Sequence, residues 1–288
     1  MLKLKRILLP VDYPNTSLSI IHQAATLAQH FQSEIILLHI VTALSHAAGV
    51  PEGGAELARW DLLAEIVRGA KKKHDESLET KLRGLTVRRM LVRGAAARAI
   101  VETAEEKKAD LIMMPPYGQT FDQFLLGSVA AKELPRIECP VWTSAHVEES
   151  RVQEFAIRHV LCAVDFNQHD RKTVSWAAQI ADEFGARLTL AHVTATVEFW
   201  GPGGTYANKQ WKEALVGDAA LHIAELQQAM GIETGVFIGS GEAPKVLSQA
   251  AKQTKADLLV TGCHPYGGRL RTHGYATMCA VPIPVLSV

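Results

Sequence analysis

The chain has 288 residues, of which 48% are hydrophobic and 21% are charged, a composition typical of a soluble globular protein with a buried core. Thirty basic and thirty acidic residues give a formal net charge of +0, so charge provides no general attraction to nucleic acid or to a membrane. There is no apolar stretch of membrane-spanning length, no signal-peptide pattern and no CxxC pair among the four cysteines, so we expect a cytoplasmic protein with reduced thiols.

The first half of the chain predicts strands that alternate with helices. Residues 5–11 form an apolar run of strand length, and residues 17–31 place apolar side chains at a helical period. Residues 34–41 are apolar without alternation, which is typical of a parallel strand buried on both faces. The elements expected next are a helix over 55–83, a strand over 86–93, a helix over 96–107, a strand over 110–114, a helix over 128–136 and a strand over 140–144.

The same layout occurs a second time. Residues 7–41 align without a gap with residues 160–194, and His39 then meets His192. Residues 94–114 align in the same way with residues 241–261, and Gly127 then meets Gly274. Internal repeats of this length indicate a duplicated domain. The domains expected from the duplication are 1–147 and 155–288, joined by a polar, charged linker.

Alternating strands and helices predict an α/β fold with parallel βαβ units. Each repeat is therefore expected to form a doubly wound, five-stranded parallel sheet with helices on both faces. Ligands of such sheets bind beyond the carboxyl ends of the strands, where the strand order reverses. Asp12 and the loop 115–127 both follow strand ends, so both are expected at that edge.

The first repeat contains several short motifs whose order and spacing occur again, with altered residues, in the second repeat. They include the opening "ILLPVD", the strand "LLHIV", the segment "ADLIMM", a glycine-containing loop that ends "GSV" and a final "CPVW". With this order and spacing the chain resembles a tandem universal stress protein, and the resemblance covers nearly all of both repeats. It implies two paired domains, arranged as a pseudo-dimer within the chain. In one group of family members it also implies ATP or another adenine nucleotide, with Mg, at the strand ends.

The resemblance also implies which residues of the first repeat line a nucleotide site. Glycines let backbone N–H groups approach phosphate, and a final Gly-Ser opens a helix whose N-terminus favours anions. Carried over to this chain, the acidic position is Asp12 and the adenine-facing strand tail is Ile40. The full set is Asp12, Ile40, Met114, Pro115, Gly118, Gly127, Ser128 and Val129.

Two departures from the family pattern affect this site. Pro115 occupies the position of the first loop glycine and has no N–H to donate. The span 119–126 between Gly118 and Gly127 is one residue shorter than the family spacing. The Gly127-Ser128 pair that opens the next helix is retained.

The second repeat departs further, and its site is expected to be degenerate. The matching residues are Asp165, Val193, Gly262 and Gly274. Pro265 occupies the second glycine position, and Tyr275 follows Gly274 where a small hydroxyl residue is expected. A bulky ring at that point leaves little room for phosphate.

Structural roles compete with these functional ones. Asp12 and Asp165 are as well suited to cap the following helices as to contact a ligand. For His39 and His192, at the ends of apolar strands, a structural role is favoured over a ligand or base. The cluster Cys263, His264, His273 and Cys279 matches no standard zinc spacing, so no metal site is expected.

The sequence leaves two functions open. The first is a stress-response binding protein with an ATP or AMP site in the first repeat. The alternative is a scaffold or interaction protein of the same family that binds no nucleotide and uses the edge strands near Val141 and Val285 or the segments 44–60 and 197–211. No catalytic motif is present, so an enzyme is not expected beyond slow ATP hydrolysis. Whether two chains form a homodimer is left open.

Overall fold

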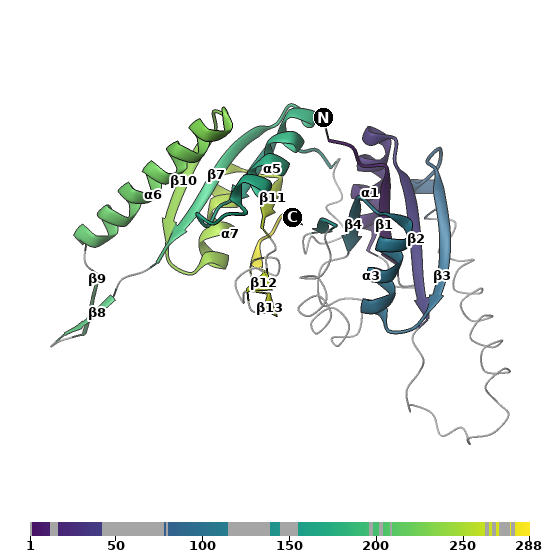
Figure 1. The fold of residues 1–288 in the computed structure, drawn as a ribbon, viewed down its shortest axis with the longest axis horizontal. Helices are drawn as coiled ribbons and strands as arrows, with labels where there is room; N and C mark the ends of the chain where they lie inside the picture. Colours follow the sequence, from purple (N-terminus) through teal and green to yellow (C-terminus); the bar gives the residue numbers. More distant parts are fainter. Residues whose placement is uncertain are drawn as a thin grey trace, which may run out of the picture. The chain divides into compact units, whose positions relative to one another are not determined.

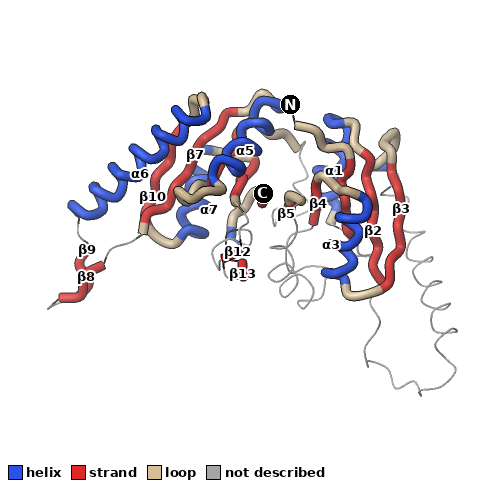
Figure 2. Tube along the Cα trace, viewed as in Figure 1, coloured by secondary structure: helices blue, strands red, loops and turns tan. Residues whose placement is uncertain are grey.

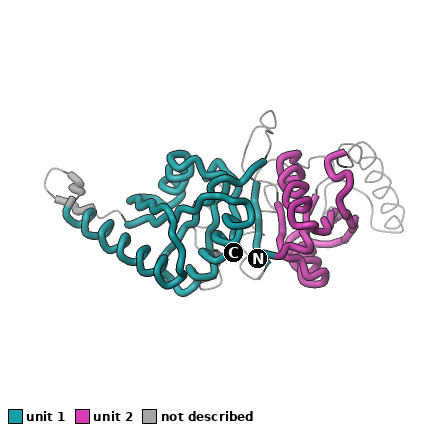
Figure 3. Tube along the Cα trace, turned by 90° about the horizontal axis from the view of Figure 1, so that it is seen from above, with its two compact units in different colours: residues 1–2, 134–288 teal, residues 3–133 magenta. Residues whose placement is uncertain are grey.

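The structure is a computed structural model. It describes residues 2–11, 17–41, 78, 80–114, 139–144, 155–195, 198–201, 204–207, 209–262, 265–266, 269–270, 277 and 280–288. By internal contacts the chain divides into two compact units, one of residues 3–133 and one of residues 1–2 and 134–288 (Figure 3). Each unit is described by itself below.

The unit of residues 3–133 contains four parallel strands in the order β4-β1-β2-β3 (Figure 1). The strands are β1 (Arg6–Val11), β2 (Glu34–Val41), β3 (Val87–Arg93) and β4 (Leu111–Met114). Two helices are described, α1 (Leu18–Phe31) between β1 and β2, and α3 (Ala96–Lys107) between β3 and β4. Strand and helix therefore alternate, as the sequence predicts.

The second unit repeats this order. Its parallel strands run β10-β7-β6-β11-β14. They are β6 (His159–Ala163), β7 (Arg187–Thr194), β10 (Gly235–Ser240), β11 (Leu258–Thr261) and β14 (Val285–Ser287). The helices between them are α5 (Asp170–Phe184), α6 (Lys209–Met230) and α7 (Ala243–Thr254) (Figure 2). The predicted five-stranded, doubly wound parallel sheet is thus confirmed in the second repeat.

The duplication extends to the residues that end the helices. α1 ends at Gln32 and α5 at the aligned Gly185, both in the left-handed region with φ of 55° and 61°. α3 and α7 end at the aligned residues Lys108 and Lys255, with φ of 51° and 54°. A left-handed residue lets its N–H reach a carbonyl of the last helical turn, which stops the helix. Three of these four positions carry a side chain there, at a small energetic cost.

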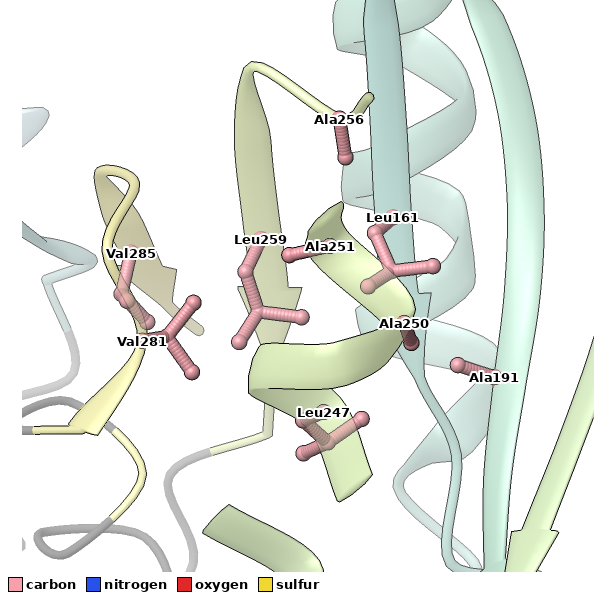
Figure 4. Packing of buried hydrophobic residues seen from close by; sticks show 9 residues of the cluster. All are labelled: Leu161, Ala191, Leu247, Ala250, Ala251, Ala256, Leu259, Val281 and Val285. Carbon is pink, nitrogen blue, oxygen red and sulfur yellow. The ribbon is translucent and has the colours of Figure 1, made fainter. Parts of the chain in front are cut away.

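The core of the second unit lies on both faces of the sheet. On one face, Leu247, Ala250 and Ala251 of α7 pack against Leu161 of β6 and Leu259 of β11 (Figure 4). The intervening strand residues, such as Val160, Leu258 and Val260, are also fully buried. A strand buried on both faces cannot alternate apolar and polar residues, which explains the unbroken apolar runs in the sequence.

The strand β5 (Val141–Thr143) pairs antiparallel with β14, with Trp142 opposite Leu286. The expectation of free edge strands near Val141 and Val285 is therefore wrong, because these two strands cover each other. All six of their residues are buried, which explains why flat apolar strands are tolerated here. The predicted domain boundaries 1–147 and 155–288 stay a prediction, and β5 belongs by its contacts to the unit of residues 134–288.

Two features were not expected from the sequence. Within 197–211, β8 (Glu198–Gly201) and β9 (Gly204–Ala207) form an antiparallel hairpin, after which α6 begins. β12 (Pro265–Tyr266) and β13 (Arg269–Leu270) form a second short antiparallel pair. The predicted helix 128–136, the segment 44–60 and nearly all of 55–83 lie outside the described residues.

Within the described part of the chain, every helix is too short or too polar to cross a membrane.

Candidate functional site

The carboxyl edge of the first sheet is the candidate ligand site. β1 lies between β2 and β4, and the register of Ile7 with Leu111 and Leu8 with Ile112 shows that β1 and β4 run side by side. From β1 the chain passes through α1 to β2, the neighbour of β1 on one side. From β3, at the end of that side, it passes through α3 to β4, the neighbour of β1 on the other side. The strand order therefore reverses between β1 and β4, which is where open α/β sheets bind ligands.

Two of the predicted site residues in this repeat are described. Met114 is the last residue of β4 and is 2% exposed, and Ile40 is half-buried near the end of β2. Both lie at the carboxyl edge, on strands that flank β1. The other predicted residues of this site lie outside the described residues: Asp12, Pro115, Gly118, Gly127, Ser128 and Val129.

In the second repeat three of the four predicted residues are described. Asp165 follows β6 and is exposed, Val193 is near the end of β7, and Gly262 follows β11 and is half-buried. Because β6 lies between β7 and β11, these residues belong to three neighbouring strand ends. The half-buried Val193 side chain packs on the hydrophobic cluster under α7. Gly274 lies outside the described residues.

A residue that the sequence did not single out organises the turn after β6. The carboxylate of Asp170, in the first turn of α5, accepts hydrogen bonds from the backbone N–H groups of Asp165, at 3.2 Å, and Asn167, at 3.2 Å. Asp170 is only 5% exposed. Its counterpart Ser17 in the first repeat makes no side-chain capping bond. The difference between serine and aspartate at aligned positions was the signal that the sequence offered.

The surroundings of Asp170 act on its pKa in opposite directions. Burial raises the pKa of this carboxyl above its usual range, and the nearby Asp165 carboxylate raises it further. The hydrogen bonds from the backbone N–H groups of Asp165, Phe166 and Asn167 lower it, by a smaller amount. The neutral form of Asp170 is therefore favoured by the folded loop, relative to a solvated aspartate.

The structural role predicted for the two aligned histidines is confirmed. Nδ1 of His39 lies 3.1 Å from the carbonyl oxygen of Val11, and Nδ1 of His192 lies 2.8 Å from that of Val164. In each case Nδ1–H donates, since a carbonyl can only accept. These bonds fix the residue just before the predicted acidic position, which is the last residue of β1 in the first repeat and the residue after β6 in the second.

In the second repeat the His192 ring has a further partner. The Phe166 ring stacks on it with centroids 4.0 Å apart, and its centroid lies 5.0 Å from that of His222 on α6. Phe166 also has a left-handed backbone, with φ of 57°. A non-glycine residue with positive φ is costly, and here stacking and the Asp170 hydrogen bonds hold it.

A pair of aligned aspartates fixes the other end of each central strand. Oδ2 of Asp110 accepts hydrogen bonds from the backbone N–H groups of Lys5 and Arg6, both at 2.8 Å. Oδ2 of Asp257 does the same for Arg158, at 2.8 Å, and His159, at 3.0 Å. The aspartate of the "KAD" motif is thus a structural residue in both repeats, at the edge of the sheet opposite the candidate site.

The described residues contain no group of three or more histidine, cysteine or acidic side chains that could hold a metal ion. The four residues of the Cys/His cluster considered in the sequence lie outside the described part of the chain.

The model of the universal stress protein family matches the chain twice, over residues 3–144 and 156–273. The chain belongs to the universal stress protein family. Because the two matches follow one another along the chain, it is a tandem universal stress protein, as the repeated motifs indicated.

Individual relatives agree with this assignment. A universal stress protein from Methanocaldococcus jannaschii is 33% identical over 143 residues, which are 48% of this chain and 79% of that protein. Universal stress protein A of Escherichia coli K12 is 29% identical over 111 residues, which are 38% of this chain and 77% of that protein. Both matches extend over about one repeat.

Solved structures show the same fold over the whole length. A universal stress protein from Archaeoglobus fulgidus has a TM-score of 0.71 at 20% identity, covering 99% of this chain and 96% of that one. A protein of unknown function from Pseudomonas aeruginosa has a TM-score of 0.63 at 16% identity, covering 99% and 92%. The tandem α/β architecture therefore occurs in other solved proteins.

Proposed function

We propose that this tandem universal stress protein is a cytoplasmic stress-response protein that binds an adenine nucleotide, ATP or AMP, in its first repeat. The second repeat contains a degenerate site that contributes structure rather than nucleotide binding. Any turnover of ATP is slow and incidental. The buried Cys162 forms no disulfide, which agrees with a reducing compartment.

The observation that carries the proposal is the reversal of strand order between β1 and β4. Because β1 and β4 are parallel neighbours, we expect the residues that follow them in the sequence, Asp12 and the glycine-containing segment from Pro115, at the same edge of the sheet. A carboxylate and a loop that opens a helix are the groups suited to a ribose and a phosphate, respectively. Ile40, near the end of β2, adds a half-buried strand tail on the side of β1 away from β4.

In this proposal each site residue has a defined role. Asp12 accepts hydrogen bonds from the ribose or base, and the backbone of Ile40 meets the adenine edge. Met114 forms the buried floor, and Gly118, Gly127, Ser128 and Val129 present backbone N–H groups to phosphate at the helix start. Pro115 contributes no N–H, which reduces the number of phosphate contacts.

Isothermal titration of the full chain with ATP and with AMP, each with and without Mg²⁺, tests the proposal. We expect one nucleotide per chain, and Gly127→Glu should abolish binding because a carboxylate repels phosphate and blocks the backbone. Absence of heat at about 100 μM protein would exclude an affinity of biological use. Mass spectrometry of the denatured protein identifies any ligand that copurifies.

The duplication provides a matched control. Gly274→Glu introduces the same charge at the aligned position of the second repeat and should leave nucleotide binding unchanged. Loss of binding in Gly274→Glu but not in Gly127→Glu would move the site to the second repeat. Equal loss in both variants would indicate that the two loops act together.

The alternative is a scaffold that binds no nucleotide, and the hairpin β8–β9 is the observation that favours it. This hairpin lies between β7 and α6, where the first repeat has a different segment, and it contains Phe199, Trp200 and Tyr206. Deletion of residues 198–207 separates the two functions. A scaffold should lose its partner in a crosslinking assay, whereas nucleotide binding in the first repeat should persist.

A further inference from the structure

β10 is the outer strand of the second sheet. Among the described residues it pairs with β7 on one side, and its other side is open (Figure 1). An outer strand directs unpaired backbone N–H and C=O groups away from the sheet, where they form a template for another strand. At the opposite end of the same parallel sheet, β14 is covered by β5. The open side of β10 is therefore a surface on which a further strand fits.

The aligned outer strand of the first repeat, β3, carries three arginines that β10 lacks. Arg88, Arg89 and Arg93 are all exposed on β3. The aligned residues of β10 are Gly235, Val236 and Ser240. Arginines on an outer strand oppose its pairing with a second copy of itself, because like charges would lie opposite each other. β3 is therefore protected against self-pairing, and β10 is not.

The side chains of β10 leave an apolar contact beside this open side. Phe237 packs on the hydrophobic cluster under α7, and Gly239 lies against Val246 of α7. Because side chains alternate along a strand, Val236 points to the opposite face, and it is 48% exposed. Gly235, which is also exposed, has no side chain to hold an approaching backbone away. Pairing with another strand would bury Val236, which is favourable.

Charged residues flank β10 but do not enter it. Glu233 precedes the strand, and Glu242 follows it with Oε2 at 2.7 Å from Nζ of Lys245. All three side chains belong to exposed residues, so they stay in water when only Gly235–Ser240 pairs. The uncharged segment is long enough for an ordinary strand.

We propose that β10 is an interface between two copies of this chain, in which the two β10 strands pair antiparallel across a two-fold axis. A two-fold axis brings the same strand of both copies together, so the strand must be compatible with itself. β10 meets this condition, because it opposes no like charges and offers no charge to attract a charged partner. Two outer strands already pair antiparallel within the chain, in β5–β14. The interface is independent of the nucleotide site proposed for the first repeat.

Sedimentation of the full chain at up to about 100 μM tests the interface, and we expect a dimer. Val236→Arg introduces the residue found at the aligned position 89, once in each copy. It should raise the dissociation constant of the dimer about tenfold or more, because like charges then meet across the pair. Val236→Thr keeps a branched, uncharged side chain and should preserve the dimer. Gln253→Arg adds the same charge at an exposed position in the last turn of α7 and should also preserve it.

Hydrogen exchange of the wild type locates the interface without any variant. The amides of Gly235–Ser240 should be about tenfold more protected at a concentration that gives the dimer than after dilution to the monomer. Peptides that cover Val141–Thr143 should exchange at the same rate at both concentrations, since β5 is already paired within the chain. If Val236→Arg does not fold, this measurement decides alone.

Four outcomes would overturn the proposal. A wild type that stays monomeric at about 100 μM leaves β10 to a different protein or to solvent. A dimer that a folded Val236→Arg variant does not weaken has its interface elsewhere. The same holds for a dimer in which exchange of β10 does not depend on concentration. Growth beyond the dimer shows that β10 pairs with a different edge, which a two-fold axis excludes.

Discussion

Nδ1 of His192 donates a hydrogen bond over 2.8 Å to the carbonyl oxygen of Val164, the residue that follows β6. Its aligned counterpart His39 makes the same bond to Val11 in the first repeat. A histidine near the end of the second strand of a repeat thus fixes the end of the first strand, just before the acidic residue. The duplicated contact explains the histidine in "LLHIV" and "LAHVT" without any catalytic role.

This contact predicts a stability cost. His192→Leu leaves the Val164 carbonyl without its donor and removes the stack on Phe166, so we expect a loss of about 1–3 kcal/mol in the free energy of unfolding. Urea denaturation measures it. His222→Leu, at a half-exposed position, should cost clearly less. Equal losses in the two variants would show that the hydrogen bond to Val164 contributes nothing.

The glycine at position 239 is required by close packing. A Cβ built there collides with Cγ1 of Val246 on α7 and lies 3.2 Å from the Phe237 ring, so Gly239→Ala should destabilise by about 1–3 kcal/mol. Gly217 in α6 has open space around it, and Gly217→Ala should stabilise by about 0.5–1 kcal/mol through helix propensity. Thermal unfolding should show a lower midpoint for Gly239→Ala and a higher midpoint for Gly217→Ala. A lower midpoint in both variants would contradict the prediction for α6.

The paired aspartates at the start of the central strands predict matched effects in the two repeats. Asp257→Ala leaves the N–H groups of Arg158 and His159 without their acceptor, and Asp110→Ala does the same for Lys5 and Arg6. Each change should cost about 1–3 kcal/mol. The exposed Asp182 serves as the control, since Asp182→Ala should remain within about 0.5 kcal/mol of the wild type in the same denaturation experiment.

The antiparallel pair β5–β14 contains a buried hydroxyl group that makes no hydrogen bond to the described residues. Oγ of Ser287 is buried and has no hydrogen-bond partner among the described residues, whereas Oγ1 of Thr143 donates to the carbonyl of Val285 at 3.3 Å. Ser287→Ala should therefore stabilise the protein by about 1 kcal/mol, and Thr143→Val should destabilise it by about the same amount. Differential scanning calorimetry would refute this if Ser287→Ala lowered the midpoint.

The Cys162 thiol should be unreactive in the folded protein. Burial raises its pKa far above the usual range, and the nearby Asp170 carboxylate raises it further, so the reactive thiolate is suppressed. With iodoacetamide at about pH 8, we expect the half-buried Cys139 to be alkylated well before Cys162, as followed by peptide mass spectrometry. Both should react at similar rates in urea, and early labelling of Cys162 without urea would contradict its burial.

Much of the fold could be predicted because the same pattern of strands and helices occurs in both repeats of the sequence. The unbroken apolar run at 34–41 predicted a strand buried on both faces, and the successive residues Ile35, Ile36, Leu37 and Leu38 of β2 are all buried. The pairing of β5 with β14 was not predictable, because the sequence of an apparent edge strand does not indicate which other strand it pairs with. The hairpin β8–β9 escaped detection because its Pro-Gly-Gly segment suits a loop equally well.

The candidate site was predictable only in part. Ile40 and Met114 lie at the expected edge because strand ends can be read from apolar periodicity. Asp170 was missed because its carboxylate accepts hydrogen bonds from backbone N–H groups of a turn in which Phe166 is left-handed, and side-chain patterns do not reveal such a turn. His159 and the aligned Arg6 were also not predicted to make matching contacts. The His159 ring hydrogen-bonds to Thr254 and Thr189, whereas the Arg6 guanidinium donates to the carbonyl of Lys107. Different side chains therefore hold the start of the central strand in the two repeats.

The hydrogen bond from Lys5 to Asp110 connects residues 105 positions apart. During synthesis, β1 emerges from the ribosome long before β4 and Asp110, which complete its second side. The first strand of each repeat is apolar, and one of its two sides stays unpaired until most of the domain has been translated. The order of translation makes β1 and β6 the segments with the greatest need of chaperone protection in the nascent chain.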